Sequence, residues 1–215
     1  MYVTYNPLVP NTRLKNNRYV IRSFLTAGGF GAVYVAEDTL MRGQLCVLKE
    51  SSDQTPDGRA QFEVEAATLS VLNHPNLVRV TDSFVEPNQK MYLVMEYIEG
   101  RTLDAVADNR PLDEAQALNF AFQLCDVLEY LHNRQPPIIY RDLKPGNVMV
   151  ETQSGILKLI DFGIVRFYKP GQRKDTHLLG TPGFSPPEQY GEKQTDARAD
   201  IFALGVTLHV LLTNY

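Results

Sequence analysis

Hydrophobic and polar positions follow two different periods along this chain, and the change of period divides it into two parts. Between residues 18 and 100 the apolar residues fall in short runs that are separated by turn-forming residues, which is typical of strands. The pattern predicts strands over residues 19–25, 32–36, 44–49, 76–85 and 90–97, and a helix over residues 59–73. We interpret Thr55-Pro-Asp-Gly58 as a break in the chain before this helix.

Beyond residue 100 the apolar residues recur at helical spacing. Pro111-Leu-Asp113 with Gln116 has the form of a capping box and predicts a helix that ends at His132. Its buried face is predicted to hold Leu118, Phe122, Cys125, Leu128 and Leu131. A last helix is predicted from Asp196 to Tyr215, with an apolar stripe of Ile201, Leu204, Leu208 and Leu211.

A polar centre lies between the two helices, within residues 138–150. Short apolar runs flank it on both sides, and Pro145-Gly146 interrupts either regular structure. Asp142, Lys144 and Asn147 are therefore predicted to lie in a loop between two short strands.

A second apolar run, residues 156–160, follows a turn-forming stretch and ends in Asp161. Two strands joined in this way form a hairpin, which brings Asp161 back beside Asn147. A carboxylate and an amide oxygen suit Mg²⁺, which prefers hard oxygen ligands. A second carboxylate, that of Asp142, could then accept a proton from a hydroxyl nucleophile.

Composition adds limits to this picture. The 215 residues are 44% hydrophobic and 21% charged, which indicates a globular protein with one domain of two lobes. The formal charge of −4 gives no support for nucleic acid or an anionic membrane as a partner. We expect no signal peptide and no membrane segment, and we interpret Cys46 and Cys125 as buried thiols in a reducing, cytoplasmic compartment.

Three segments carry a resemblance to a known family. Tyr140-Arg-Asp-Leu-Lys-Pro-Gly-Asn147 resembles the catalytic loop of protein kinases, and Asp161-Phe-Gly163 resembles their magnesium segment. Gly180 to Glu188 is similar to the end of their activation segment, and its sequence is most similar to that of bacterial serine/threonine kinases. The histidines are scattered, so no zinc site is predicted.

The resemblance implies an α+β, two-lobed fold, with a small antiparallel β lobe that holds one helix and a mainly helical large lobe. Residues 1–17 are expected to be a leader without regular structure, and residues 18–100 and 101–215 to be the two lobes of a kinase domain. Because the family's fold continues for several more helices, we expect a fragment with an incomplete large lobe. Its last helix is then expected to expose an apolar patch.

The resemblance also implies an ATP site in the first lobe. Lys49 would contact the phosphates and pair with Glu65, for which Glu63 is the competitor. Thr26 stands where the family has the first glycine of its loop, and Tyr140 where it usually has histidine. The residues implied to bind the nucleotide are Leu25, Thr26, Ala27, Gly28, Gly29, Phe30, Gly31, Val33, Val47, Lys49, Met95, Glu96, Tyr97, Ile98 and Met149.

For catalysis the resemblance implies that Asp142 orients the substrate hydroxyl and that Lys144 stabilises charge on the phosphoryl group. Asn147 and Asp161 would hold Mg²⁺, with Mn²⁺ as a substitute. Asp200 matches the aspartate that holds the catalytic-loop backbone. The candidates for regulatory phosphorylation are Thr176, with Arg141 as its cationic partner, and after it Thr181 and Ser185.

Three functions are consistent with these residues. The first is an ATP-dependent serine/threonine protein kinase that phosphorylates its own activation segment through a transient dimer. The second is a catalytically impaired nucleotide-binding signalling module, either a pseudokinase or an inactive fragment. The third is a kinase of small molecules. The segment Gly180 to Glu188 favours a protein substrate, because this segment positions a peptide in the family.

Overall fold

The computed structural model describes residues 6–28, 31–51, 53, 55–161, 166–167, 180–190 and 195–215, with the backbone alone at 166–167. The chain forms two compact units. The first comprises Met1–Asn73 and Val78–Tyr97, and the second comprises His74–Leu77 and Ile98–Tyr215. Four residues, His74–Leu77, thus belong to the second unit although the chain returns to the first after them.

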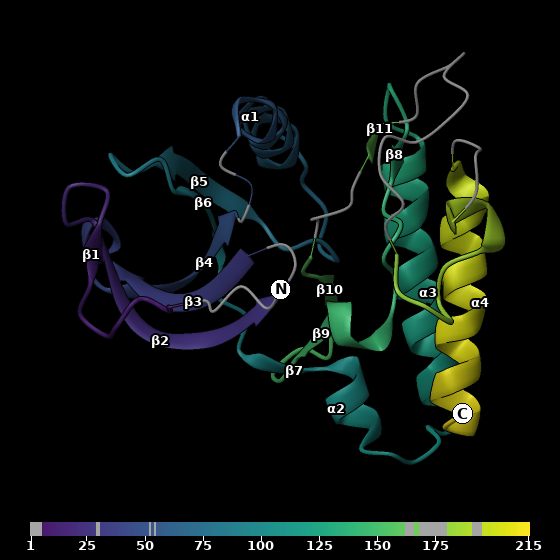
Figure 1. Cartoon of the computed structure of the whole chain (residues 1–215). Helices are drawn as coiled ribbons and strands as arrows, with labels where there is room; N and C mark the ends of the chain where they lie inside the picture. The colour runs from purple at the N-terminus through teal and green to yellow at the C-terminus, as the bar shows by residue number, and fades with distance from the viewer. Residues whose placement is uncertain are drawn as a thin grey trace. The chain divides into compact units, whose positions relative to one another are not determined.

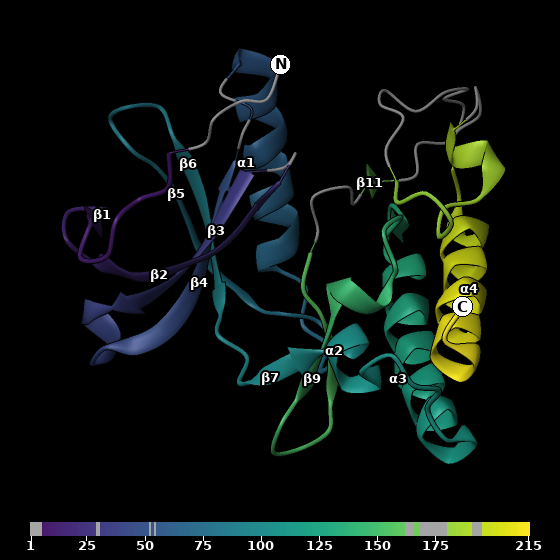
Figure 2. The ribbon, with the colours of Figure 1, turned by 60° about the horizontal axis from the view of Figure 1, so that its bottom comes forward.

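The first unit is an antiparallel sheet with one helix, as predicted. Its strands follow the order β1-β2-β3-β4-β6-β5. The elements are β1 (Arg13–Leu14), β2 (Tyr19–Gly28), β3 (Gly31–Asp38), η1 (Thr39–Met41), β4 (Gln44–Ser51), α1 (Pro56–Ser70), β5 (Val80–Val85) and β6 (Met91–Glu96). Figures 1 and 2 show this sheet strongly curled, with α1 beside β5 and β6.

Aromatic side chains join the two ends of the curled sheet. Phe84 on β5 stacks on Tyr19 of β2, with ring centroids 5.5 Å apart, and on Tyr92 of β6 at 5.2 Å. Since β2 and β5 lie near opposite ends of the strand order, the first contact requires the sheet to curl. Tyr19 and Tyr92 are fully buried, and burial of such large rings contributes much of the apolar stabilisation of a small unit.

Asp82 on β5 connects the same two ends of the sheet through ion pairs and a hydrogen bond. Its carboxylate accepts hydrogen bonds from Lys15 Nζ at 2.6 Å, from Arg18 Nη1 at 3.0 Å and from the Tyr19 hydroxyl at 2.6 Å. Burial alone would raise the pKa of Asp82. The hydrogen bonds from Lys15 and Tyr19 outweigh burial, so the pKa of Asp82 lies below its ordinary value.

Replacing Asp82 with asparagine is expected to lower the free energy of unfolding by about 2 kcal/mol, because three buried or half-buried donors lose a charged acceptor. A carboxylate whose pKa is lowered by folding stabilises the fold above its unfolded pKa. The difference between parent and variant should therefore be largest at neutral pH and shrink below about pH 4.

Urea unfolding followed by circular dichroism measures this difference, and Asp108→Asn is the matched control because that carboxylate is exposed. Equal unfolding midpoints for the two variants at neutral pH would contradict a role for Asp82 in closing the sheet.

Helix α1 begins earlier than its apolar period predicts. The prediction of residues 59–73 is wrong at both ends, because the helix spans Pro56–Ser70. Thr55 is its N-cap, whose side chain accepts a hydrogen bond from the Gly58 N–H at 3.1 Å, and Pro56 opens the first turn. The stretch interpreted as a break is therefore a helix start, as threonine followed by proline often is.

The expectation that residues 1–17 hold no regular element is also wrong. Arg13–Leu14 forms β1, and Asn11 N–H donates to the Ile21 carbonyl at 2.8 Å. Asn11, Asn16 and Asn17 all have positive φ angles. Asparagine tolerates this conformation better than most residues, so a segment that reads as a linker folds back along β2.

The strand predicted over residues 76–85 is shorter in the structure, because β5 begins only at Val80. The backbone of the earlier residues is used by the second unit. Leu159 N–H donates to the Asn76 carbonyl at 2.9 Å, and Asn76 Nδ2 donates to Gln123 and to the Leu157 carbonyl at 2.9 and 2.8 Å. These bonds explain why His74–Leu77 belongs to the second unit.

The second unit is mainly helical. Its elements are β7 (Gly100–Thr102), α2 (Leu103–Ala107), α3 (Glu114–His132), β8 (Ile138–Ile139), η2 (Pro145–Asn147), β9 (Val148–Glu151), β10 (Leu157–Leu159), β11 (Arg166–Phe167), η3 (Pro187–Tyr190) and α4 (Ala197–Thr213). Strands pair in the orders β10-β9-β7 and β11-β8. Figures 1 and 2 show α3 and α4 side by side. As predicted, Asp113 caps α3 by accepting the Gln116 N–H at 2.9 Å.

The buried face of α3 differs from the prediction. The helix buries Ala117, Phe120, Leu124, Val127, Leu128 and Leu131. Leu118 is 49% exposed and Phe122 is 73% exposed, and Cys125 is an exposed free thiol. Because α3 carries apolar residues around most of its circumference, the helical period alone does not select the face that packs on α4.

Helix α4 buries only part of its predicted stripe. Leu204 and Leu211 are buried, but Ile201 is 55% exposed, together with Phe202 and Leu212 at 44% each. The described part of the second unit therefore leaves an apolar strip along α4 open to solvent.

Candidate active site

The strand register gathers several predicted nucleotide-binding residues on one face of the first unit's sheet. Thr26 lies opposite Val33, and Val33 lies opposite Lys49. Val47, two residues before Lys49 on β4, lies opposite Met95. Opposite residues and residues two apart point to the same face of a sheet, so these five side chains share a face. The other face carries the hydrophobic core.

The glycine-rich loop lies where β2 meets β3. Gly28 and Gly31 form the last register pair of this hairpin, and Gly29-Phe30 lies outside the described residues. Leu25 and Ala27 on β2 are exposed. The sheet register therefore places the predicted loop at the end of the hairpin, with exposed residues leading into it.

The predicted hinge residues lie at the end of β6 and directly after it. Glu96 ends this strand, and its carboxylate accepts the Arg79 N–H at 3.0 Å. Tyr97 is 42% exposed, while Ile98 is buried and begins the second unit. Met149 lies in the second unit, on β9.

Lys49 and Glu65 are both half-buried, on β4 and α1 of the first unit. The competitor Glu63 is exposed and pairs with Arg59 at 3.2 Å, one helical turn away. Glu65 is therefore the better placed of the two glutamates for a partner inside the unit. The Lys49–Glu65 pair itself stays a prediction.

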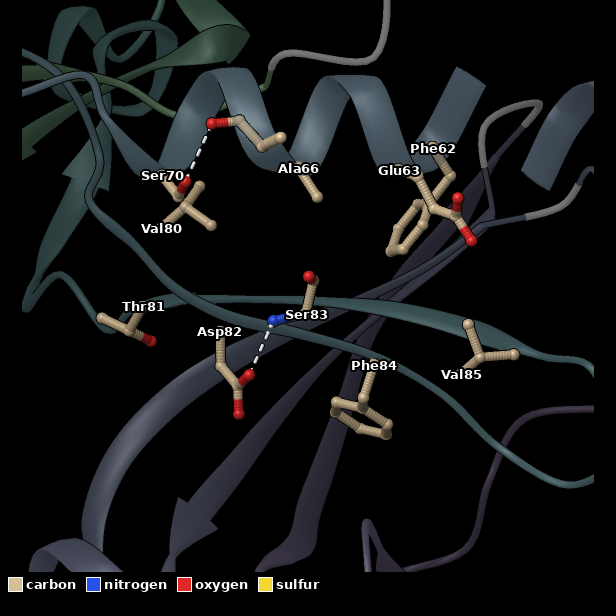
Figure 3. Close-up of a pocket in the computed structure, with 11 residues that line it drawn as sticks. Phe62, Glu63, Ala66, Ser70, Val80, Thr81, Asp82, Ser83, Phe84 and Val85 are labelled. Carbon is tan, nitrogen blue, oxygen red and sulfur yellow. Dashed lines mark hydrogen bonds between the residues drawn. The ribbon is translucent and has the colours of Figure 1, made fainter. Parts of the chain in front are cut away.

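A groove of about 470 Å³ also lies in the first unit, between α1 and β5. Figure 3 shows Phe62 and Ala66 projecting from α1 toward the strand that carries Val80 and Ser83. Among the described residues, none of those predicted to bind the nucleotide lines this groove. It is therefore separate from the candidate active site.

In the second unit a cluster of hydrogen bonds surrounds Asp142, which is only 6% exposed. The Thr181 hydroxyl donates to Asp142 Oδ1 at 2.6 Å, and Asn147 Nδ2 donates to Asp142 Oδ2 at 2.7 Å. Lys144 Nζ lies 3.2 Å from Asp142 Oδ2 and donates to Thr181 Oγ1 at 2.7 Å. A carboxylate, an ammonium group and a hydroxyl thus meet at one point, as the resemblance implies for these positions.

The predicted hairpin forms and brings Asn147 beside the segment that ends in Asp161. Strands β9 and β10 are antiparallel, and Ile160 N–H donates to the Asn147 carbonyl at 3.1 Å. The Asn147 amide nitrogen is turned toward Asp142, so its amide oxygen points elsewhere. The Asn147 amide oxygen and the half-buried Asp161 carboxylate are hard oxygen ligands. Ligands of this type are the ones that Mg²⁺ prefers.

Asp200 of α4 fixes the backbone of the catalytic loop. It is fully buried, and its carboxylate accepts the Arg141 N–H at 2.7 Å and the Tyr140 N–H at 2.9 Å. His132, the last residue of α3, bonds to the same carboxylate at 2.7 Å. No local pattern assigns His132 more than a helix-end position, because its partner lies 68 residues away.

Tyr140, the first residue of the catalytic-loop segment, is fully buried. Burial, followed by the negative charges of Asp161 and Asp142, holds the pKa of its hydroxyl well above the ordinary value. The phenol is therefore neutral at physiological pH, whereas a histidine here could carry a charge.

Two of the three phosphorylation candidates lie within the described residues. The Thr181 hydroxyl is engaged with Asp142 and Lys144, and Ser185 is only 9% exposed. Thr176 lies outside the described residues. Arg141, its predicted cationic partner, is only 4% exposed.

Comparison with known proteins identifies the family of this chain. The family model of the protein kinase domain matches residues 19–215. The chain belongs to the protein kinase family. Its predicted two-lobed kinase fold is therefore confirmed, and the catalytic-loop cluster lies inside the matched region.

Similar kinases occur in several organisms. The chain is 36% identical to serine/threonine-protein kinase B of Synechocystis, over 94% of this chain and 38% of that protein. It is 34% identical to serine/threonine-protein kinase PrkC of Bacillus subtilis, over 92% of this chain and 31% of that protein. It is 35% identical to serine/threonine-protein kinase Nek11 of mouse, over 96% of this chain and 33% of that protein. The chain thus spans between 31% and 38% of the length of these three relatives.

The described residues of this kinase-family chain show neither a membrane-spanning helix nor a cluster of metal-binding side chains. No helix among them is long and apolar enough to cross a membrane. Within the same residues, no group of three or more histidine, cysteine, aspartate or glutamate side chains could hold a metal ion.

Proposed function

We propose that this chain transfers the γ-phosphoryl group of ATP to serine or threonine hydroxyls of protein substrates. The contact of Asp142 with Lys144, Asn147 and Thr181 carries the proposal, because it places a proton acceptor beside a cation. Membership of the protein kinase family and similarity to proteins named serine/threonine-protein kinases support it.

In the proposed step the substrate hydroxyl oxygen attacks the γ-phosphorus while its proton passes to Asp142. The bond between this phosphorus and the oxygen that bridges to ADP breaks, and ADP leaves. Lys144 stabilises the negative charge on the transferred group. Most of the rate enhancement then comes from position and electrostatics, since both side chains are already oriented by hydrogen bonds.

Asn147 and Asp161 would hold Mg²⁺, with Mn²⁺ as a substitute. The bound metal would neutralise phosphate charge and favour departure of ADP. The two bonds from the Asn147 amide nitrogen to Asp142 couple this site to the proton acceptor, because they fix the side chain that supplies the amide oxygen.

The nucleotide would lie against the sheet face that carries Val33, Val47 and Met95. Lys49 on the same face would contact the phosphates, with Glu65 as its ionic partner. The backbone of residues 96–98 would bind adenine.

We place regulatory phosphorylation first at Thr176, with a transient dimer as the route to autophosphorylation. The hydroxyls of Thr181 and Ser185 are poorer acceptors of a phosphoryl group, because one is bonded within the active site and the other is buried. Phosphate on Thr181 would also separate Asp142 from Lys144.

The test uses labelled ATP with Mg²⁺ and three kinds of acceptor, namely serine and threonine peptides, tyrosine peptides and small hydroxyl compounds. Label is expected in the serine and threonine peptides, at a rate that depends on Mg²⁺. Label in the small compounds alone would overturn the proposal in favour of a small-molecule kinase.

A further inference from the structure

The residue before the proposed proton acceptor has an unusual backbone. Arg141 has a φ angle of +71°, in the left-handed region that non-glycine residues seldom adopt. Such a conformation persists only where surrounding contacts hold it. Here both backbone polar groups of Arg141 are bonded to buried side chains.

The two side chains come from different elements of the second unit. Asp200 of α4 accepts the Arg141 N–H at 2.7 Å, and Gln189 of η3 donates from Nε2 to the Arg141 carbonyl at 2.9 Å. Gln189 is 5% exposed and Asp200 is fully buried. The carbonyl that Gln189 binds belongs to the peptide bond that leads directly into Asp142.

The side chain of Gln189 packs closely against the backbone of Gly180. A Cβ atom on Gly180 would lie 2.5 Å from Gln189 Nε2 and would clash with Ser185 Oγ. Only glycine allows the backbone to approach these side chains so closely. Gly180 immediately precedes Thr181, which bonds to Asp142 and Lys144.

Residues 180–190 therefore contact the catalytic loop at two separate points. Thr181 contacts the reacting end of Asp142, and Gln189 contacts the backbone on the N-terminal side of the same residue. A segment that forms hydrogen bonds on both sides of Asp142 can fix the orientation of the Asp142 side chain. Small errors in the orientation of a catalytic group lower the reaction rate strongly.

We propose that Gln189 is a positioning residue for phosphoryl transfer, which holds Asp142 in its working direction through the Arg141 carbonyl. This inference rests on the proposed function. The neutral amide of Gln189 links residues 180–190, the segment expected to bind the peptide substrate, to the proton acceptor Asp142. This link is independent of the Thr181 contact.

The first variant is Gln189→Met, which keeps the approximate size of the side chain and removes the donor. The value of kcat is expected to fall by roughly 10- to 100-fold, with KM for ATP, ATP binding and Tm near those of the parent. Gln116→Met is the matched control, because Gln116 is an exposed glutamine of α3. This control should retain the parent's kcat.

The second variant is Gln189→Glu, which keeps the shape of the side chain. A protonated carboxyl group can donate to the Arg141 carbonyl, whereas a carboxylate cannot. Charged groups near this position include Arg141, Asp142, Asp200 and the neighbouring Glu188, and all of these except Arg141 are acidic. The kcat of this variant relative to the parent should therefore rise as the pH falls, which a purely space-filling role would not produce.

A readout that does not need catalysis accompanies both variants. Amide hydrogen exchange should become faster in residues 140–147 of Gln189→Met, with α3 unchanged. If the parent transfers no phosphate but this exchange pattern is found, the proposed function fails while the positioning contact stands. Unchanged kcat and exchange in a folded Gln189→Met, or a parallel loss of kcat, ATP binding and Tm, would overturn the inference.

Discussion

The Asp142→Asn variant is expected to transfer phosphate about 10²- to 10⁴-fold more slowly than the parent, because the amide cannot accept the proton of the substrate hydroxyl. The change is nearly isosteric, so the contacts of Asp142 with Thr181 and Lys144 can be kept in part. ATP binding should be retained, since no part of the proposed nucleotide contact involves this carboxylate.

Single-turnover transfer to a threonine peptide and equilibrium binding of ATP measure the two effects separately. Asp108→Asn, an exposed aspartate beside Arg110, is the matched control and should behave as the parent. Equal transfer rates in Asp142→Asn and the parent would contradict the assigned role of Asp142. Loss of ATP binding in step with transfer would indicate damage to the fold instead.

The largest effect on stability is expected at Asp200. Replacement by alanine leaves the backbone N–H groups of Tyr140 and Arg141, together with His132, without their acceptor in the interior. Removing one partner of a buried charged network costs about 3–5 kcal/mol, which is a large share of the stability of most domains. Transfer should also fall, because Asp200 no longer holds the Arg141 backbone next to Asp142.

Urea unfolding compares Asp200→Ala with Asp200→Asn and Asp196→Asn. Asp200→Asn keeps one oxygen acceptor and should fall between the parent and alanine. Asp196 is the N-cap of α4, four residues before Asp200 and nearer the surface, where an asparagine still caps the helix. A parent-like unfolding midpoint for Asp200→Ala would show that the catalytic-loop backbone does not depend on this side chain.

The residues that could be assigned from sequence are those whose chemistry lies within one short segment. Asp142, Lys144 and Asn147 are separated by at most five positions, and the hairpin that brings Asp161 to them has a local turn signal. The separate strands of the first lobe could be predicted from short apolar runs. Their antiparallel arrangement was implied by the resemblance to protein kinases, and their order comes only from the structure. Thr55 shows the limit of such signals, because proline after threonine fits both a chain break and a helix start.

The contacts that could not be assigned depend on tertiary packing. The buried face of α3 depends on where α4 lies, and two or more apolar faces were available to it. Gln189 and His132 act through partners 48 and 68 residues away, so no local pattern distinguishes them from ordinary polar residues. Asn76 reads as part of a strand, but its backbone and side chain are bonded to β10 and α3.

The intact mass of the purified chain after incubation with Mg²⁺ and ATP, measured beside Asp142→Asn, tests the proposed activity most directly. Phosphoryl groups are expected on serine or threonine residues of the parent, with Thr176 first, and not on the variant. Equal phosphorylation of both proteins would contradict the role of Asp142. A parent that modifies neither itself nor added serine and threonine peptides would contradict the proposed activity of this chain.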